Sequence, residues 1–241
     1  MPHQVHIKKK WAISDNLATP ESAYMQRREF LKGTALTTLA TIGVLYGCGS
    51  SSAPNVLPEI KWTELDKSIY PAKRNLTYEL DRPITDEKIA STYNNFYEFG
   101  AEKIDPVHYA HKLNQRPWTV QVNGLVNKPM TFDIDDLLKS MPIEERVLRL
   151  RCVEAWAMAV PWTGFALSEL LKRVEPKLEA THVRFETFYE PFTAHGQLAF
   201  WEPWPYVEGL TIKEAMNELA FLATGIYGHP APKQHGAPIR L

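Results

Sequence analysis

Short apolar runs, several of them alternating with polar residues, predict the strands of this chain. Residues 118–124 alternate apolar and polar side chains and end at a glycine, which is typical of a strand followed by a turn. Further strands are predicted over residues 146–152, 181–188 and 219–226. In the run over residues 146–152, the alternation places Cys152 on the apolar face.

Helical patterns lie between these runs. The segment that begins at Asp133 resembles a capping box, and Thr211 and Glu214 have the spacing of one. Short helices are predicted over four segments: residues 85–91, 133–140, 167–174 and 211–218. The strands and helices alternate irregularly and without an internal repeat, which predicts an α+β fold with mixed sheets and short helices.

Three segments lack such patterns. Residues 53–83 are polar and interrupted by prolines, which predicts an extended arm that runs over a surface. Residues 105–117 predict a loop. Residues 234–241 resemble the entry to a strand with no polar tail after it, so we expect the fold to be incomplete at its C-terminus.

Composition narrows the classes of protein that the chain can represent. Apolar residues make up 44% and charged residues 23%, which is enough apolar material for a buried core. The 27 basic and 28 acidic residues nearly balance, and no long basic run occurs. The sequence therefore gives no electrostatic support for nucleic-acid binding.

The N-terminal region carries an export signal. Arg27 and Arg28 are followed by Glu-Phe-Leu-Lys and then by an apolar stretch over residues 33–46. That stretch is shorter than the ~20 residues that span a membrane, and it has the length of a signal-peptide core. The pattern resembles a twin-arginine signal, which predicts export of a folded protein to the periplasm.

Two cleavage sites are possible, and both leave the exported protein with the same number of free thiols. The segment that ends at Cys48 resembles a lipoprotein box, and small residues near Ala53 offer an ordinary cleavage site, which we favour. Either cleavage leaves Cys152 as the one free thiol, because only two cysteines are present. We therefore divide the chain into the extension and signal (1–53), the arm (54–93) and the main domain (94–241).

The residue types around Cys152 leave three roles open. A lone cysteine at the end of a strand can be a buried small hydrophobe, a metal or cofactor ligand, or a nucleophile. Glu154 is either a solvated carboxylate or a proton carrier. Arg149 and Arg151 are either exposed strand residues or partners of an anion. His108 has the helical spacing of a metal pair with His111, but both are expected to be surface residues of a loop.

Five separated motifs occur in one order along the chain: NNFYEFG from Asn94, LRCVEAW from Leu150, VPWTGF from Val160, YVEGL from Tyr206 and HGAPIR from His235. Together they resemble the catalytic subunit of the periplasmic protein-methionine-sulfoxide reductases, which are molybdenum enzymes with the sulfite-oxidase fold. The resemblance covers roughly residues 58–241 and includes the twin-arginine signal.

The resemblance implies a molybdenum–molybdopterin cofactor without an attached nucleotide. The thiolate of Cys152 would be the protein ligand of the molybdenum. Six other positions would contact the cofactor: Asn94, Tyr97, Glu98, Thr187, His235 and Arg240. The family often has asparagine where this chain has His235, and its chains continue past the position of Leu241 with a basic segment that completes the cofactor site.

The resemblance also implies a reaction and its partners. Reduced molybdenum would take the oxygen atom from methionine sulfoxide in an oxidised periplasmic protein, which repairs that protein. Two electrons, from a haem-containing integral membrane subunit, and two protons would then restore the metal and release water. The catalytic subunit is expected to be monomeric, and Glu154 is expected to relay protons beside the metal.

Three alternatives stay open at this point. A sulfite dehydrogenase, or a reductase of small S- or N-oxides, could use the same fold, and the former should carry further arginines around an anion pocket. An exported binding lipoprotein, anchored at Cys48, would need Cys152 only as a buried residue. A cysteine hydrolase would need a histidine base beside Cys152.

Overall fold

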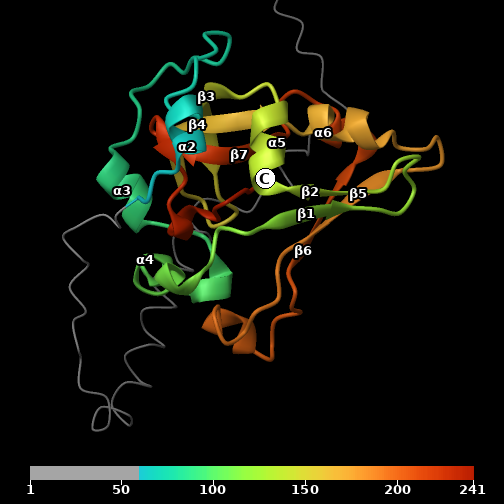
Figure 1. Ribbon diagram of the computed structural model, residues 1–241. Helices are drawn as coiled ribbons and strands as arrows, with labels where there is room; N and C mark the ends of the chain where they lie inside the picture. Colours follow the sequence, from blue (N-terminus) through green and yellow to red (C-terminus); the bar gives the residue numbers. More distant parts are fainter. Residues whose placement is uncertain (1–59) are drawn as a thin grey trace, which may run out of the picture. The chain divides into compact units, whose positions relative to one another are not determined.

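The computed structural model describes residues 60–241 (Figure 1). The predicted export signal at Arg27 and Arg28, and the predicted cleavage positions at Cys48 and near Ala53, lie outside the described residues. Within residues 60–241, no helix has the length and apolar character that crossing a membrane requires.

A four-stranded antiparallel sheet forms the centre of the described part (Figure 1). Its strands lie in the order β3 (Glu144–Arg151), β4 (Ala157–Ala166), β7 (Phe221–Ile226) and β8 (His229–Pro230). The register shifts between Thr163 and Gly164, where β4 pairs with β7. A β-carbon at Gly164 would come 2.0 Å from the Leu222 carbonyl oxygen, so this close strand pairing requires glycine.

Two ribbons and several short helices accompany the sheet. One ribbon pairs β1 (Thr119–Val122) with β2 (Met130–Asp133), and the other pairs β5 (His182–Glu186) with β6 (Val207–Thr211). The α-helices are α2 (Glu64–Ile69), α3 (Glu87–Thr92), α4 (Asp105–Tyr109), α5 (Ile134–Ser140), α6 (Leu167–Val174) and α7 (Ile212–Ala215). Single 3₁₀ turns are η2 (Tyr97–Phe99), η3 (Ala110–Lys112), η4 (His195–Leu198) and η5 (Lys233–His235).

Strand β4 lies in the core because both of its faces are covered. On one face Phe165 packs with apolar side chains of α5 and α6, which include Leu137 and Leu171. On the other face Val160 and Trp162 pack with residues of β7 in a second cluster. The prediction of an α+β fold is confirmed. Because β4 is covered on both faces, it anchors the hairpin that joins β3 to β4 in the core.

Two sequence-based predictions about irregular segments were wrong. The segment predicted as an extended arm contains α2. Its first turn is stabilised by a reciprocal capping box between Thr63 and Asp66. The segment 105–117, predicted as a loop, contains α4, because Pro106 occupies the first helical turn, where its missing amide hydrogen costs nothing.

Candidate functional site

The candidate site begins at the tip of the hairpin that joins β3 to β4. The antiparallel register pairs Arg151 with Ala157 and leaves a short turn between them. The Cys152 amide donates to the Trp156 carbonyl at 3.0 Å, and the Ala155 amide donates to the Cys152 carbonyl at 3.1 Å. Ala155 has φ of 70°, a left-handed conformation that non-glycine residues rarely adopt. The turn therefore fixes the position of Cys152 at the end of β3.

The surroundings of Cys152 bear on the three roles that its sequence context allowed. The residue is half-buried at the hairpin tip rather than part of the core, which does not fit the interpretation as core filler. Its side-chain partner is Glu154, whose Oε2 lies 3.8 Å from Sγ. Among residues 60–241 no histidine is hydrogen-bonded to the thiol, so the nucleophile interpretation gains no base.

Glu154 is the centre of a polar cluster beside the thiol. Its carboxylate accepts a hydrogen bond from the Tyr97 hydroxyl through Oε1. The Oε2 atom lies 2.6 Å from the Lys103 ammonium and accepts from the Trp156 indole at 3.2 Å. Lys103 also donates to the Tyr97 hydroxyl at 2.8 Å. The cluster thus connects η2 and the segment after it to the turn that carries Cys152.

These contacts determine the charge of the cluster. Hydrogen bonds from Lys103, from Tyr97 and from Trp156 lower the pKa of Glu154 to about 2, so its carboxylate is ionised at neutral pH. Burial and the bond to Glu154 raise the pKa of Tyr97, so its hydroxyl stays protonated. A proton relay through Glu154 stays a prediction, and such a relay would begin with the carboxylate accepting a proton.

A second group of predicted residues surrounds a narrow cavity next to the sheet. Asn94, His235 and Arg240 all line it, together with Trp162. The Arg240 guanidinium donates to the His235 carbonyl at 3.3 Å and to Asn95 Oδ1 at 3.4 Å. It also lies 5.3 Å from the centre of the Trp162 ring. The guanidinium is therefore held in one place by two acceptors and an aromatic ring.

Backbone pairing explains how the C-terminal segment reaches this cavity. The Ala223 amide donates to the Arg240 carbonyl at 2.7 Å, and the Arg240 amide donates back at 2.9 Å. This bridge attaches Arg240 to β7, while the turn η5 places His235 against α3, where Nε2 lies 3.4 Å from Ser91 Oγ. Asn94 is fixed on the same element, because its side-chain amide donates to the Ser91 carbonyl at 2.9 Å.

Burial sets the protonation states in this group. Burial and, to a lesser degree, the nearby positive charge of Arg240 lower the pKa of His235 to about 3, so the imidazole is neutral at pH 7. Burial also lowers the pKa of Arg240, against the opposing charges of Glu98 and Cys152. Glu98 is buried, and burial raises the pKa of its carboxyl group. A hydrogen bond with Thr187 and the positive charge of Arg240 lower this pKa and offset part of the rise.

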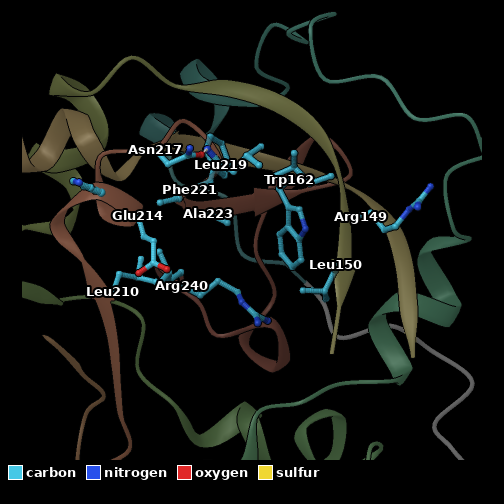
Figure 2. Close-up of a pocket in the computed structure, with 14 residues that line it drawn as sticks. Arg149, Leu150, Trp162, Leu210, Glu214, Asn217, Leu219, Phe221, Ala223 and Arg240 are labelled. Atoms are coloured by element: carbon cyan, nitrogen blue, oxygen red, sulfur yellow. Dashed lines mark hydrogen bonds between the residues drawn. The ribbon is translucent and has the colours of Figure 1, made fainter. Parts of the chain in front are cut away.

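An open groove adjoins the narrow cavity (Figure 2). Its volume is about 570 Å³, and it shares Leu150, Trp162 and Arg240 with the narrow cavity. Figure 2 shows the side chains of Trp162, from β4, and Arg240, from the C-terminal segment, pointing toward the same region next to Leu150. Most of the rest of its lining is apolar, and its polar members are Arg149, Lys213, Glu214 and Asn217. The groove therefore presents mainly apolar walls that include the Arg240 guanidinium.

Of the predicted site residues, Tyr97 and Glu154 lie beside Cys152, and Asn94, His235 and Arg240 line the narrow cavity. Three further residues that sequence reasoning missed contact these groups. The additional residues are Lys103, Ser91 and Asn95. Asn95 follows a predicted residue directly and could have been included on that ground. Lys103 and Ser91 gave no signal, because a single lysine in a loop and a serine in a short helix match no motif.

The two histidines considered as a metal pair lie in different environments. His108 Nε2 is buried without a hydrogen-bond partner in the described part of the chain, and His111 is exposed. In residues 60–241 no group of three or more His, Cys, Asp or Glu side chains is placed to hold a metal ion.

The fold and site together define a class: an α+β protein with a half-buried thiol at a hairpin tip and a half-buried guanidinium beside a mainly apolar groove. A family model, the oxidoreductase molybdopterin-binding domain, matches residues 107–241, which is more than half of the chain. The chain therefore belongs to the molybdopterin-binding oxidoreductase family, and its α+β fold is of the sulfite-oxidase type. Asn94, Tyr97 and Glu98 lie before the matched residues.

One solved structure similar to this chain is the sulfane dehydrogenase SoxCD from Paracoccus pantotrophus. The TM-score is 0.48 at 16% sequence identity, over 86% of this chain and 53% of that chain. This chain therefore spans about half of the length of the structure it matches.

The residues present fit a molybdopterin. The thiol of Cys152 is a soft ligand of the kind that binds molybdenum alongside the sulfurs of the pterin. The Arg240 guanidinium suits a phosphate group, which it can bind with two parallel hydrogen bonds. Gln234 Nε2, in the turn η5 beside His235, is buried without a hydrogen-bond partner among residues 60–241, which leaves a polar group there for a ligand to satisfy.

Proposed function

We propose that this chain is a molybdenum-dependent reductase of methionine sulfoxide in exported proteins. Membership of the molybdopterin-binding family supports the cofactor and the oxidoreductase class. The five motifs that resemble the protein-methionine-sulfoxide reductases support the substrate. The observation that carries the proposal is the cluster of Glu154, Lys103 and Tyr97 beside the thiol of Cys152.

This chain's residues would hold the cofactor at both ends. Cys152 would ligate the molybdenum, and Arg240 would bind the phosphate, with Asn94 and the neutral His235 as hydrogen-bonding groups between them. When bound, the molybdenum–pterin group supplies a centre that accepts an oxygen atom and exchanges two electrons with its substrate and its electron donor. Tyr97, Glu98 and Thr187 complete the proposed set of cofactor contacts.

The charge of the cluster favours a neutral substrate over an anion. Glu154 is ionised, and its carboxylate is the polar group in contact with the Cys152 thiol. Lys103 balances that charge at 2.6 Å, so the cluster offers no net positive charge to an anion such as sulfite. A sulfoxide is neutral and polar, and the Tyr97 hydroxyl and Lys103 ammonium are hydrogen-bond donors next to the thiol.

The proposed reaction requires electrons, protons and a substrate from outside this chain. Conversion of a sulfoxide to a thioether and water consumes two electrons and two protons. The twin-arginine signal supports action in the periplasm, and there the electrons would come from a haem-containing integral membrane subunit. The substrates would be oxidised periplasmic proteins, because the sulfoxide makes an apolar methionine side chain polar and so disrupts packing.

An activity screen of the molybdenum-loaded full-length protein tests this proposal. A reduced dye would supply electrons, and the substrates would be an oxidised unfolded protein, free methionine sulfoxide and trimethylamine N-oxide. We expect dye oxidation with the oxidised protein and with free methionine sulfoxide. The same preparation would be assayed for sulfite oxidation with a dye that accepts electrons.

Two results of the screen would contradict the proposal. Sulfite oxidation without sulfoxide reduction would indicate a sulfite dehydrogenase on the same fold. A protein purified without molybdenum from cells that make the cofactor, and inactive on every substrate, would favour the binding-lipoprotein interpretation.

A further inference from the structure

Lys103 occupies a central position in the site, although neither the family match nor the sequence motifs assign it a role. Its ammonium lies 2.6 Å from Glu154 Oε2 and 2.8 Å from the Tyr97 hydroxyl, and 4.7 Å from the centre of the Tyr97 ring. The side chain is only 20% exposed, so these contacts are partly shielded from water. Charged pairs of this kind are stronger than fully exposed ones.

The main chain of Lys103 also takes part in the site. Its carbonyl oxygen accepts a hydrogen bond from the Asn94 amide at 2.9 Å. Asn94 lines the narrow cavity, and its side chain is fixed by the Ser91 carbonyl. Lys103 therefore contacts two of the proposed cofactor residues, Asn94 through its backbone and Tyr97 through its ammonium, and its ammonium also pairs with Glu154.

The turn that carries Cys152 has few other attachments. Val153 is fully exposed, and Ala155 has the unfavourable left-handed backbone conformation. Apart from the turn's own backbone bonds, it is attached through Glu154 and through the Trp156 ring, which lies 5.2 Å from the Tyr93 ring. The Lys103–Glu154 pair is therefore the ionic contact that fixes this turn to the segment around η2.

We propose that Lys103 is a positioning residue that clamps the Cys152 turn through Glu154. By holding the Glu154 carboxylate against Tyr97 and Trp156, it fixes the direction in which the thiol of Cys152 points. The inference rests on the proposed function only for the role of Cys152 as a ligand. The clamp itself belongs to the protein without cofactor and is measurable there.

Backbone amide exchange in the cofactor-free full-length chain tests the clamp. The amides of Cys152 and Ala155 are hydrogen-bonded within the turn, so their exchange reports how often the turn opens. Lys103→Met keeps the length of the side chain and removes its charge and donors. We expect it to accelerate exchange at these two amides at least about fivefold, as loss of one partly shielded ion pair allows.

Matched variants separate the clamp from a general loss of stability. Lys103→Arg keeps a charged donor and should restore exchange to within about twofold of the wild type. Lys139→Met removes a comparable but exposed pair with Asp136 on α5 and should leave the turn unchanged. Glu154→Gln should accelerate exchange as Lys103→Met does, and the double variant should add little, because both changes break one interaction.

Three outcomes would overturn the proposal: wild-type exchange at the turn in Lys103→Met, no rescue by Lys103→Arg, or additive effects in the double variant. Exchange of the central strand β4 in the same samples shows whether a variant is folded. The exchange measurement needs neither substrate nor cofactor. Its result on the clamp is therefore independent of whether the protein reduces sulfoxides.

Discussion

Two ionisable residues of the candidate site have opposite environments, and each environment fixes one protonation state. Glu154 lies at an exposed hairpin tip, where the Lys103 ammonium and two neutral donors keep its carboxylate ionised. His235 lies in the interior, where burial and the charge of Arg240 keep its imidazole neutral. At neutral pH the site thus contains a fixed carboxylate near the thiol and an uncharged ring near the guanidinium.

The neutral His235 predicts a loss of stability in acid. Its folded pKa of about 3 lies below the ordinary histidine pKa of 6.5, so below pH 6.5 the unfolded chain binds a proton that the folded chain does not. The contribution is fully present above pH 6.5 and is lost as the pH falls toward 3. His235→Asn should reduce the difference in the free energy of unfolding between pH 7 and pH 5, measured in urea, by about 1.4 kcal/mol or more.

A matched histidine variant gives the control for that experiment. His182→Asn changes an exposed ring on β5 and should keep the wild-type dependence on pH. If His235→Asn and the wild type lose stability equally between pH 7 and pH 5, the buried neutral imidazole is not the cause.

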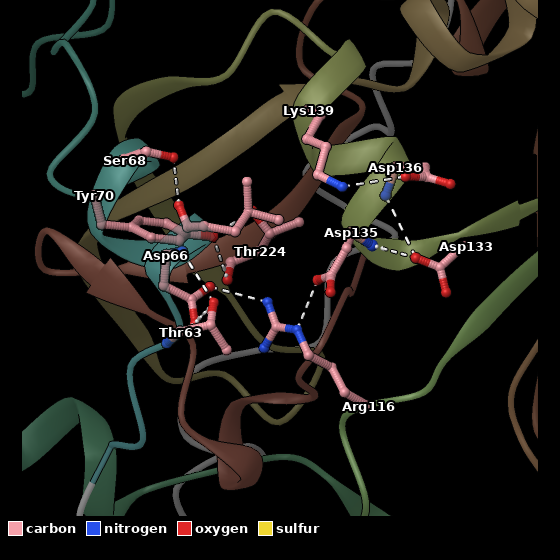
Figure 3. Close-up of polar contacts among 11 residues, drawn as sticks. Thr63, Asp66, Ser68, Tyr70, Arg116, Asp133, Asp135, Asp136, Lys139 and Thr224 are labelled. Atoms are coloured by element: carbon pink, nitrogen blue, oxygen red, sulfur yellow. Dashed lines mark hydrogen bonds and ion pairs between the residues drawn. The ribbon is translucent and has the colours of Figure 1, made fainter.

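At the scale of elements, an ionic network attaches α2 to α5 (Figure 3). Arg116 donates to Asp66 at 2.9 Å and to Asp135 at 2.7 Å, and Figure 3 shows its guanidinium between the two carboxylates. Asp66 is 1% exposed, so its charge depends on this partner and on its capping contacts with Thr63. Tyr70, at the end of α2, donates to the carbonyl of Thr224 on β7 at 3.0 Å.

Loss of Arg116 should therefore lower the free energy of unfolding. Arg116→Met leaves the buried Asp66 carboxylate without its cation, and we expect a loss of about 2 kcal/mol in the free energy of unfolding, less than for a fully buried pair because Arg116 is partly exposed. Urea unfolding measures it, with Lys139→Met as the exposed-pair control, for which we expect less than about 0.5 kcal/mol. Equal effects of the two variants would show that the network is not a structural attachment.

The close pairing of β4 with β7 makes a second prediction at this scale. Gly164→Ala would place a β-carbon against the Leu222 carbonyl oxygen, and neither strand can move without losing its packing. We expect a loss of about 2–3 kcal/mol in thermal or urea unfolding. Gly209→Ala, where the nearest atom to a β-carbon would be the Val183 carbonyl oxygen at 3.9 Å, should cost less than about 1 kcal/mol. A tolerated Gly164→Ala would contradict the described register.

The elements differ in how far the sequence could predict them. The helix over 167–174 was predicted with its observed bounds, because its apolar residues recur at the helical period. Strand β4 was missed, since both faces are buried and the pattern does not alternate, and Pro161 and Gly164 are typical of loops. The site residues came from motif resemblance, whereas Lys103 depends on a tertiary contact that no local pattern records.

At the scale of the whole molecule, the candidate site is assembled from three segments that are distant in sequence. Asn94, Tyr97 and Lys103 precede the sheet, Cys152 lies on its hairpin, and Arg240 follows its strand β7. This arrangement explains why the site requires the sheet: β7 positions Arg240, and β3 with β4 positions Cys152. The proposed function thus requires that the thiol at the hairpin tip, Cys152, is the protein ligand of molybdenum.

X-ray absorption at the molybdenum edge tests that claim most directly. The measurement compares the full-length molybdenum-loaded protein with its Cys152→Ser variant and counts the sulfur neighbours of the metal. We predict one sulfur neighbour fewer in Cys152→Ser, with loss of sulfoxide reduction. An unchanged number of sulfur neighbours in the variant would contradict the account, because molybdenum would then be bound without Cys152.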